Sequence, residues 1–214
     1  MQKYFVVILD IIDSTKVEDR DAITFTLTHA LSKINSNYDE CCWALFEITK
    51  GDEVAAVLLN AHRIYEILKI FQEILSPHRF RVVVYYDTLT AGIDTHRSTI
   101  IDGPAFYRAN TLMIDLKKTQ KYFVIKSGFT DIDVAIESLV NLLLWRWNNL
   151  TELQRIIISQ YQKIRNQQKV AEKIGRTQQQ IQDSLSRCRW EIIDNAEKTV
   201  GHLLTRIDSL IESQ

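Results

Sequence analysis

The chain has 214 residues, of which 46% are hydrophobic, and its net charge is −1. Because domains commonly have about 100–200 residues, this length predicts one large hydrophobic core or two small ones, and two domains are the working expectation. The longest apolar run near the start, residues 4–9, is far shorter than the roughly 20 residues of a membrane-spanning helix, so we expect a soluble protein with no membrane partner.

The charge is unevenly distributed along the chain. Residues 150–190 hold 8 basic and 3 acidic side chains, whereas residues 1–140 hold 15 basic and 19 acidic ones. A local basic surplus is typical of a segment that contacts phosphate, although it is also typical of an ordinary solvated surface.

The cysteines and the N-terminus predict the compartment. Cys41, Cys42 and Cys188 show no metal-ligand spacing and cannot all pair with one another, and no signal peptide is present. We therefore expect a reducing, cytoplasmic location.

The first part of the chain predicts alternating strands and helices. A continuous β-branched and aromatic run is typical of a strand buried on both faces, and apolar residues at three- and four-residue intervals predict helices. The expected elements are a strand at 4–9, a helix at 19–35, a hairpin of strands at 41–48 and 54–59, a helix at 64–75 that ends before Pro77, and a strand at 79–86.

This β-α-β-β-α-β order predicts the ferredoxin-like arrangement and hence an α+β fold class. In that arrangement the first and second strands are parallel, and the third lies antiparallel between them. The C-terminal end of the first strand and the tip of the hairpin then share one edge of the sheet. Asp10 and Asp52 are therefore expected to be neighbours.

The remainder of the chain predicts a change to helical structure. A helix at 105–116 and a strand at 122–125 precede Lys126-Ser127-Gly128, where we place a boundary between a first domain at 1–127 and a helical domain at 128–214. A capping box at Thr151 predicts a helix start. Within about 150–190, Gly175 in a turn and Thr177 at a helix cap predict a helix-turn-helix.

The acidic edge predicts a metal and nucleotide site, because Mg²⁺ is held by one or two carboxylates together with phosphate oxygens. We expect Asp10 and Asp52, with Ile11 beside them, to hold Mg²⁺ or Mn²⁺ with a nucleoside triphosphate. The loop that receives the phosphates would be formed by Ile12, Asp13, Ser14 and Thr15. The alternative interpretation is that Gly51-Asp52 only turns the hairpin and that Asp10 only caps the approach to the first helix.

Three motifs carry a resemblance to known families. The stretches ILDIIDST, TKGDEVAAVL and IDGPAFYRAN resemble the two metal motifs and the closing helix of class III nucleotidyl cyclases and related palm-type domains. In this order, and followed by a helical tail, they resemble the SatD family over almost the whole chain. The resemblance implies a cyclase-like palm domain joined to a helix-turn-helix.

One departure from the cyclase pattern concerns activity. Cyclases carry an Asn and an Arg on the closing helix, and this chain has Tyr107 and Thr111 there. Loss of such a charge stabiliser typically costs several orders of magnitude in rate. Two interpretations stay open: a domain that binds a nucleotide without turning it over, and an active nucleotidyl cyclase or oligonucleotide-forming polymerase.

The helix-turn-helix resembles the region-four type of sigma factors, which implies DNA as a partner, with the second helix in a major groove. The residues expected at base edges are Gln178, Gln179 and Gln182, and those expected at phosphates are Lys169, Arg176, Arg187 and Arg189. The alternative is a three-helix packing module that binds no DNA.

The second helix is expected to continue beyond the motif with apolar residues at heptad spacing, namely Ile193, Ala196, Val200, Leu203, Ile207 and Leu210. This seam predicts a homodimer. The alternative is that it packs on the preceding helix of the same chain, at Leu139, Leu143, Trp145 and Trp147.

Overall fold

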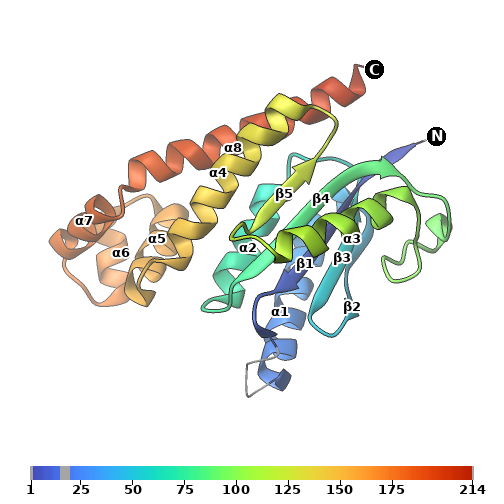
Figure 1. Cartoon of the computed structure of the whole chain (residues 1–214). Helices are drawn as coiled ribbons and strands as arrows, with labels where there is room; N and C mark the ends of the chain where they lie inside the picture. The colour runs from blue at the N-terminus through green and yellow to red at the C-terminus, as the bar shows by residue number, and fades with distance from the viewer. Residues whose placement is uncertain (1, 15–19, 214) are drawn as a thin grey trace.

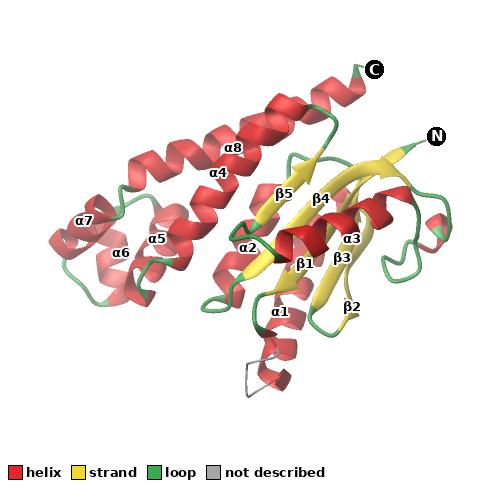
Figure 2. Ribbon diagram, viewed as in Figure 1, coloured by secondary structure: helices red, strands yellow, loops and turns green. Residues whose placement is uncertain are grey.

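A five-stranded sheet forms the centre of the N-terminal part of the computed structural model, which describes residues 2–14 and 20–213. The strands are β1 (Lys3–Ile11), β2 (Cys42–Lys50), β3 (Glu53–Leu58), β4 (Phe80–Thr88) and β5 (Phe123–Lys126). Their order in the sheet is β2-β3-β1-β4-β5 (Figure 2). β1 is antiparallel to both β3 and β4, and β5 extends the sheet by pairing with β4 in parallel. The predicted α+β class and the β-α-β-β-α-β order are confirmed.

Helices cover both faces of this sheet. Figure 1 shows α3 (Pro104–Lys117) on one face, with α1 (Arg20–Tyr38) and α2 (Ile64–Leu75) on the other. Because successive side chains of a strand point to opposite faces, β1 serves two cores. Phe5, Val7 and Leu9 pack with α1 and α2, whereas the alternate residues Tyr4, Val6 and Ile8 pack with α3. Asp10 continues the second series and therefore faces α3.

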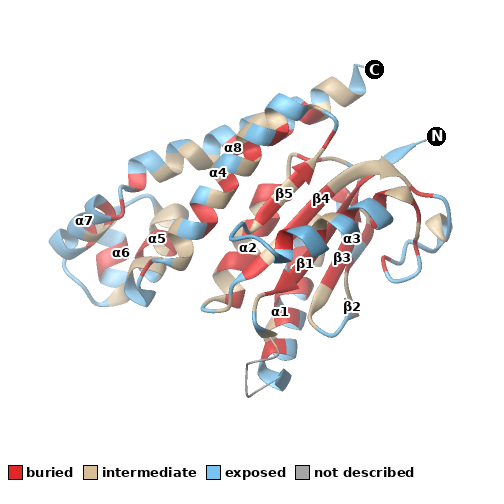
Figure 3. Cartoon of the chain, in the orientation of Figure 1, coloured by how far each residue is buried: buried red, intermediate tan, exposed pale blue. Residues whose placement is uncertain are grey.

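Two long helices complete the core on the α2 side of the sheet. α4 (Thr130–Asn148) and α8 (Trp190–Glu212) lie alongside each other (Figure 1). Val140 of α4 and Val200 of α8 belong to the same hydrophobic cluster as the sheet residues. Figure 3 shows the buried residues concentrated between the sheet and its helices and along the α4–α8 contact. Packing thus continues across the expected boundary at 127/128, and the division into two domains there stays a prediction.

The three remaining helices have a core of their own. These are α5 (Glu152–Ile164), α6 (Gln167–Ile174) and α7 (Gln178–Arg187). Ile158, Val170, Ile181 and Leu185 fill the space between them, and Trp190 at the start of α8 closes it. This three-helix unit projects from the end of the α4–α8 pair (Figure 1).

The expectation that the second helix of the motif continues to the C-terminus is wrong. α7 ends at Arg187, and α8 begins at Trp190 after Arg189, whose φ of 53° lies in the left-handed region and breaks the helix. The apolar seam of α8 faces the interior of its own chain, because Val200 and Ile207 are buried in the core that contains Leu143 of α4. Packing within one chain, the alternative interpretation, accounts for the seam. The apolar seam of α8 therefore no longer supports a homodimer, which stays a prediction.

Only some of the α4 residues that were expected to pack against the seam of α8 are buried. Leu143 is buried and Leu139 packs against the core, but Trp145 points outward and is 53% exposed. None of the helices in the described part of the chain combines the length and apolar character needed to cross a membrane.

Candidate functional site

Strand register brings the two predicted metal ligands to one edge of the sheet. Leu9 of β1 pairs with Val54 of β3, so Asp10 lies one residue after this pair and Asp52 lies two residues before it. Gly51 forms the turn between β2 and β3, just before Asp52, with a φ of 63° that glycine adopts without steric cost. The backbones that carry the two carboxylates are therefore adjacent, as the strand order predicts.

The two carboxylates contact different parts of the molecule. Asp10, 8% exposed, accepts a hydrogen bond from Lys117 of α3, with 2.6 Å between Nζ and Oδ1. Asp52 instead faces α1, where it lines a hollow of about 230 Å³ together with Ser14 and Arg20. Oδ2 of Asp52 is buried and has no hydrogen-bond partner among residues 2–14 and 20–213. An unpaired buried acceptor is costly, so this oxygen is suited to a cation or a donor from a ligand.

The predicted phosphate loop is partly committed to contacts within the chain. Ile11 is buried as the last residue of β1. The N–H of Ile12 donates to the carbonyl of Arg79 at 2.8 Å, so it is not free to bind a phosphate in this conformation. Asp13 has a φ of 59°, and its carboxylate lies 4.0 Å from the Arg79 guanidinium. Ser14 lines the hollow beside Asp52, and Thr15 lies outside the described residues.

A divalent metal fits this edge only with help from a ligand. The described residues contain no group of three or more His, Cys, Asp and Glu side chains that would hold a metal ion. One or two carboxylates suffice when a nucleotide adds phosphate oxygens. Oδ2 of Asp52, which has no partner in the described part of the chain, fits a metal shared in this way, whereas Lys117 already neutralises one oxygen of Asp10.

The closing helix does not direct its two predicted positions at Asp10. Tyr107 donates from its hydroxyl to Asp102 Oδ2 at 2.7 Å, and Thr111 donates to the Tyr107 carbonyl at 2.9 Å. Lys117, which contacts Asp10, lies ten residues beyond Tyr107 on α3, or about 15 Å along the axis at ~1.5 Å per residue. Sequence analysis missed Lys117, because nothing local distinguishes it from Lys118, which pairs with Asp115.

The predicted caps of the helix-turn-helix are present. Thr177 Oγ1 accepts from the N–H of Gln180 at 3.2 Å, and Gln180 Oε1 accepts from the N–H of Thr177 at 3.0 Å. Gly175 ends α6 with a φ of 67°. Val170 and Ile181 are fully buried between the two helices. Both ends of the turn are thus satisfied locally, so α7 is held in a defined orientation against α6.

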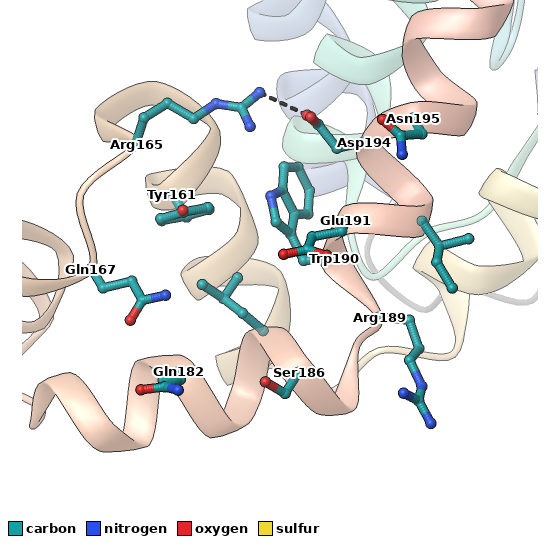
Figure 4. A pocket seen from close by; sticks show the side chains of 12 residues that line it. Tyr161, Arg165, Gln167, Gln182, Ser186, Arg189, Trp190, Glu191, Asp194 and Asn195 are labelled. Carbon is teal, nitrogen blue, oxygen red and sulfur yellow. Dashed lines mark hydrogen bonds and ion pairs between the residues drawn. The ribbon is translucent and has the colours of Figure 1, made fainter.

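All seven residues expected to contact DNA are exposed, namely Lys169, Arg176, Gln178, Gln179, Gln182, Arg187 and Arg189. Their surroundings differ, however. The Gln179 amide donates to Asp183 at 2.8 Å, which places an acid missed by the sequence analysis on the exposed side of α7. Gln182 and Ser186 line a groove of about 650 Å³ between α5, α7 and α8. Arg189 extends away from them (Figure 4).

The other wall of this groove fixes α5 to α8. Arg165 donates to Asp194 at 2.7 Å, the contact drawn as a dashed line in Figure 4. Its guanidinium also lies over the ring of Trp190, 5.4 Å from the centroid. The hydrogen bond from Arg165 lowers the pKa of the Asp194 carboxyl. Arg165 and Asp194 therefore hold the start of α8 in place behind the three-helix unit.

A family model describes nearly the entire chain. The SatD family model matches residues 4–203. The chain belongs to the SatD family. This confirms the resemblance inferred from the three motifs and their order.

Other comparisons are distant. No curated protein matches this SatD-family chain. A bacterial light-regulated adenylyl cyclase is similar at 14% identity over 62% of this chain and 79% of that chain, with a TM-score of 0.43. The adenylyl cyclase CyaB from P. aeruginosa is similar at 18% identity over 58% and 77%, with a TM-score of 0.39. A regulator of polyketide synthase expression from Bifidobacterium adolescentis is similar at 9% identity over 98% and 86%, with a TM-score of 0.25. At these TM-scores, function has to be argued from the sites themselves.

Helix α2 connects the two candidate sites of the SatD-family chain. Just beyond its C-terminal end, Arg79 accepts the hydrogen bond from Ile12 beside the acidic edge. In its last turn, Glu73 accepts a hydrogen bond from Lys163 of α5 at 2.6 Å and another from Ser159. Residues 73–79 therefore carry a contact with the acidic edge at one end and a contact with the first helix of the three-helix unit at the other.

Proposed function

We propose that this SatD-family protein is a DNA-binding regulator whose cyclase-like domain binds a nucleoside triphosphate together with Mg²⁺ or Mn²⁺. The observation that carries the proposal is the capped α6–α7 pair, which exposes Lys169 on α6, Arg176 in the turn and Arg187 on α7. Cations on a helix-turn-helix support phosphate contacts that position the second helix on a duplex.

The acidic edge supports the ligand half of the proposal. Asp52 lines a hollow that also contains Ser14 and the cationic side chain of Arg20, and its buried Oδ2 has no hydrogen-bond partner among the described residues. A hollow with one carboxylate and one guanidinium beside a turn suits a metal–phosphate pair, because the carboxylate binds the metal cation and the guanidinium binds the phosphate anion. Asp52 would hold the metal on the α1 side of the sheet, and the metal would supply positive charge that neutralises the phosphates of the nucleotide.

The contacts at the end of α2 support a coupling between the two halves. Ligand binding that shifts the loop at Ile12 would alter its hydrogen bond to the Arg79 carbonyl. Glu73 lies six residues before Arg79, on α2, where it contacts Lys163 of α5. Such coupling requires that the ligand has different affinities for two arrangements of these elements.

DNA binding is tested by fluorescence anisotropy with mixed genomic fragments at several salt concentrations, with and without each NTP and Mg²⁺. We expect binding that weakens steeply with salt and changes with one NTP. Affinity that is the same for all fragments and all ligands contradicts the DNA-reading half of the proposal.

Nucleotide binding is tested by thermal unfolding with each NTP and Mg²⁺ or Mn²⁺. A ligand at about 100 times its dissociation constant adds about 2.7 kcal/mol of stability, which raises the midpoint by roughly 5–10 °C in a chain of this size. The shift should disappear in Asp52→Asn and persist in Asp94→Asn, a matched change of an exposed acid. Chromatography of the same mixtures tests the alternative of an active cyclase or polymerase, which requires a product that Asp52→Ala does not make.

A further inference from the structure

The second helix of the helix-turn-helix carries an acid at the centre of its outward face. Ile181 and Leu185 of α7 are buried, and Asp183 lies two residues from each, about 200° around the helix at ~100° per residue. Gln179 lies two residues before Ile181 and shares this outward direction. Both Gln179 and Asp183 are exposed. When α7 enters a major groove with its outward face, these two side chains point into the groove.

A hydrogen bond fixes how these two side chains face the groove. Nε2 of Gln179 donates to Oδ1 of Asp183 at 2.8 Å. An ionised carboxylate can only accept, so the amide nitrogen of Gln179 has to point at Asp183 and the amide oxygen has to point away. The pair therefore offers mainly acceptors to a base edge, namely Oε1 of Gln179 and the second carboxylate oxygen of Asp183.

The negative charge of Asp183 is not neutralised on its own helix. Arg187 lies four residues later, a spacing at which helical side chains can form ion pairs. Within residues 2–14 and 20–213, however, the Asp183 carboxylate is bound by Gln179 and forms no ion pair with Arg187. An acid that faces DNA is repelled by the phosphates of every sequence. It can favour one sequence over another only by accepting a hydrogen bond from a base.

We propose that Asp183 accepts a hydrogen bond from the N4 amino group of a cytosine in the major groove, and that Gln179 positions its carboxylate. Guanine and thymine present acceptors but no donor at this edge, so they repel a carboxylate. Adenine presents the acceptor N7 beside its N6 donor, which suits an amide better than a carboxylate. Asp183 therefore selects cytosine. This inference rests on the proposed DNA binding and adds the base that one position of the site contains.

Helix α6 contains a matched glutamine–acid pair. Nε2 of Gln168 donates to Oε1 of Glu172 at 3.3 Å, with the same four-residue spacing as the pair on α7. Glu172 is also exposed. The first helix of a helix-turn-helix crosses the DNA backbone and does not enter the groove. Glu172→Gln therefore removes the same charge as Asp183→Asn without changing a contact to a base.

The experiment selects binding sites from a random duplex library with the full chain and with three variants, at one salt concentration. The natural chain should select cytosine at one position, and guanine there should lower the affinity about tenfold in anisotropy titrations. Asp183→Asn should select adenine at that position, because an amide both donates and accepts. Glu172→Gln should keep the preference for cytosine. Gln179→Ala should keep cytosine with a smaller preference, because the carboxylate is no longer held in place.

The results separate this inference from the proposed function. The same base preference in the natural chain and in Asp183→Asn overturns the role of Asp183, although DNA binding stands. DNA binding without any base preference overturns that role as well. Loss of the cytosine preference in Glu172→Gln would attribute it to charge and not to a base contact. An unchanged preference in Gln179→Ala overturns the positioning role of Gln179. The absence of DNA binding by the natural chain and all variants overturns the proposed function itself, and this inference with it.

Discussion

Lys163 of α5 and Glu73 of α2 form an ion pair with 2.6 Å between Nζ and Oε1, although 90 residues separate them in the sequence. Ser159 of α5 donates to the same carboxylate oxygen. The pair joins the last turn of a helix that packs on the sheet to the first helix of the three-helix unit. It is thus a direct polar contact between α2 and the three-helix unit.

Replacement of Lys163 by Met should lower the free energy of unfolding by about 0.5–1 kcal/mol at pH 7, because the pair is partly exposed and screened by solvent. Burial raises the pKa of the Glu73 carboxyl, but the hydrogen bonds from Lys163 and Ser159 lower it by more, so the net pKa lies below its ordinary value. A depressed pKa contributes stability above the unfolded-state pKa of about 4.3, and that stability is lost as the pH falls through the folded-state pKa.

The measurement for this pair is urea unfolding of both proteins at several pH values. The difference between them should be largest near pH 7 and should shrink below about pH 4.3. Lys121→Met, a change of an exposed lysine elsewhere, should show no such pH dependence. A difference that is constant with pH would mean that the charge of Glu73 is not involved.

Thr177→Ala should destabilise the start of α7 by about 1 kcal/mol, because it removes the side-chain acceptor of the Gln180 N–H. Hydrogen exchange of the first-turn amides of α7 checks this locally, and DNA anisotropy checks its effect on binding. Thr177→Ser keeps the acceptor and should behave as the natural chain does. Similar exchange in the alanine and serine variants would show that the cap does not hold α7.

Arg187→Ala should weaken DNA binding and reduce the slope of log K against log salt by about 1, because one phosphate contact and its released counterion are lost. Lys121→Ala removes one positive charge on the sheet side of the molecule and should leave the slope unchanged. An unchanged slope in Arg187→Ala would exclude Arg187 from the phosphate contacts.

Arg189→Gly should affect stability and DNA binding in opposite directions. A non-glycine residue with a φ of 53° is strained, and replacement by glycine removes about 1 kcal/mol of this strain. Part of that gain in stability is offset, because glycine has a greater conformational entropy in the unfolded chain. The same change removes a predicted phosphate contact and should weaken DNA binding. Urea unfolding and anisotropy measure the two effects. Lower stability of Arg189→Gly would indicate that the arginine side chain contributes more by packing than its backbone costs.

Local sequence patterns determined the order of elements and the position of the acidic edge. Alternating and helical periods depend on neighbours within a few residues, so the β-α-β-β-α-β order could be inferred without tertiary contacts. Once this order is known, strand direction alone places Asp10 beside the Gly51-Asp52 turn. The Thr177 cap is likewise a short-range feature, because its partner Gln180 lies three residues away.

Only the tertiary structure decided which distant side chains contact each other and what the apolar face of α8 packs against. Heptad spacing in α8 is the same whether Val200 packs on another chain or on its own α4, and the structure places it in its own core. The break at Arg189 also escaped the sequence pattern, because arginine rarely adopts a left-handed φ. The contacts of Lys117 with Asp10 and of Lys163 with Glu73 join residues 107 and 90 positions apart. No local period encodes such distances, and only the packing of α3 on the sheet and of α5 beside α2 creates them.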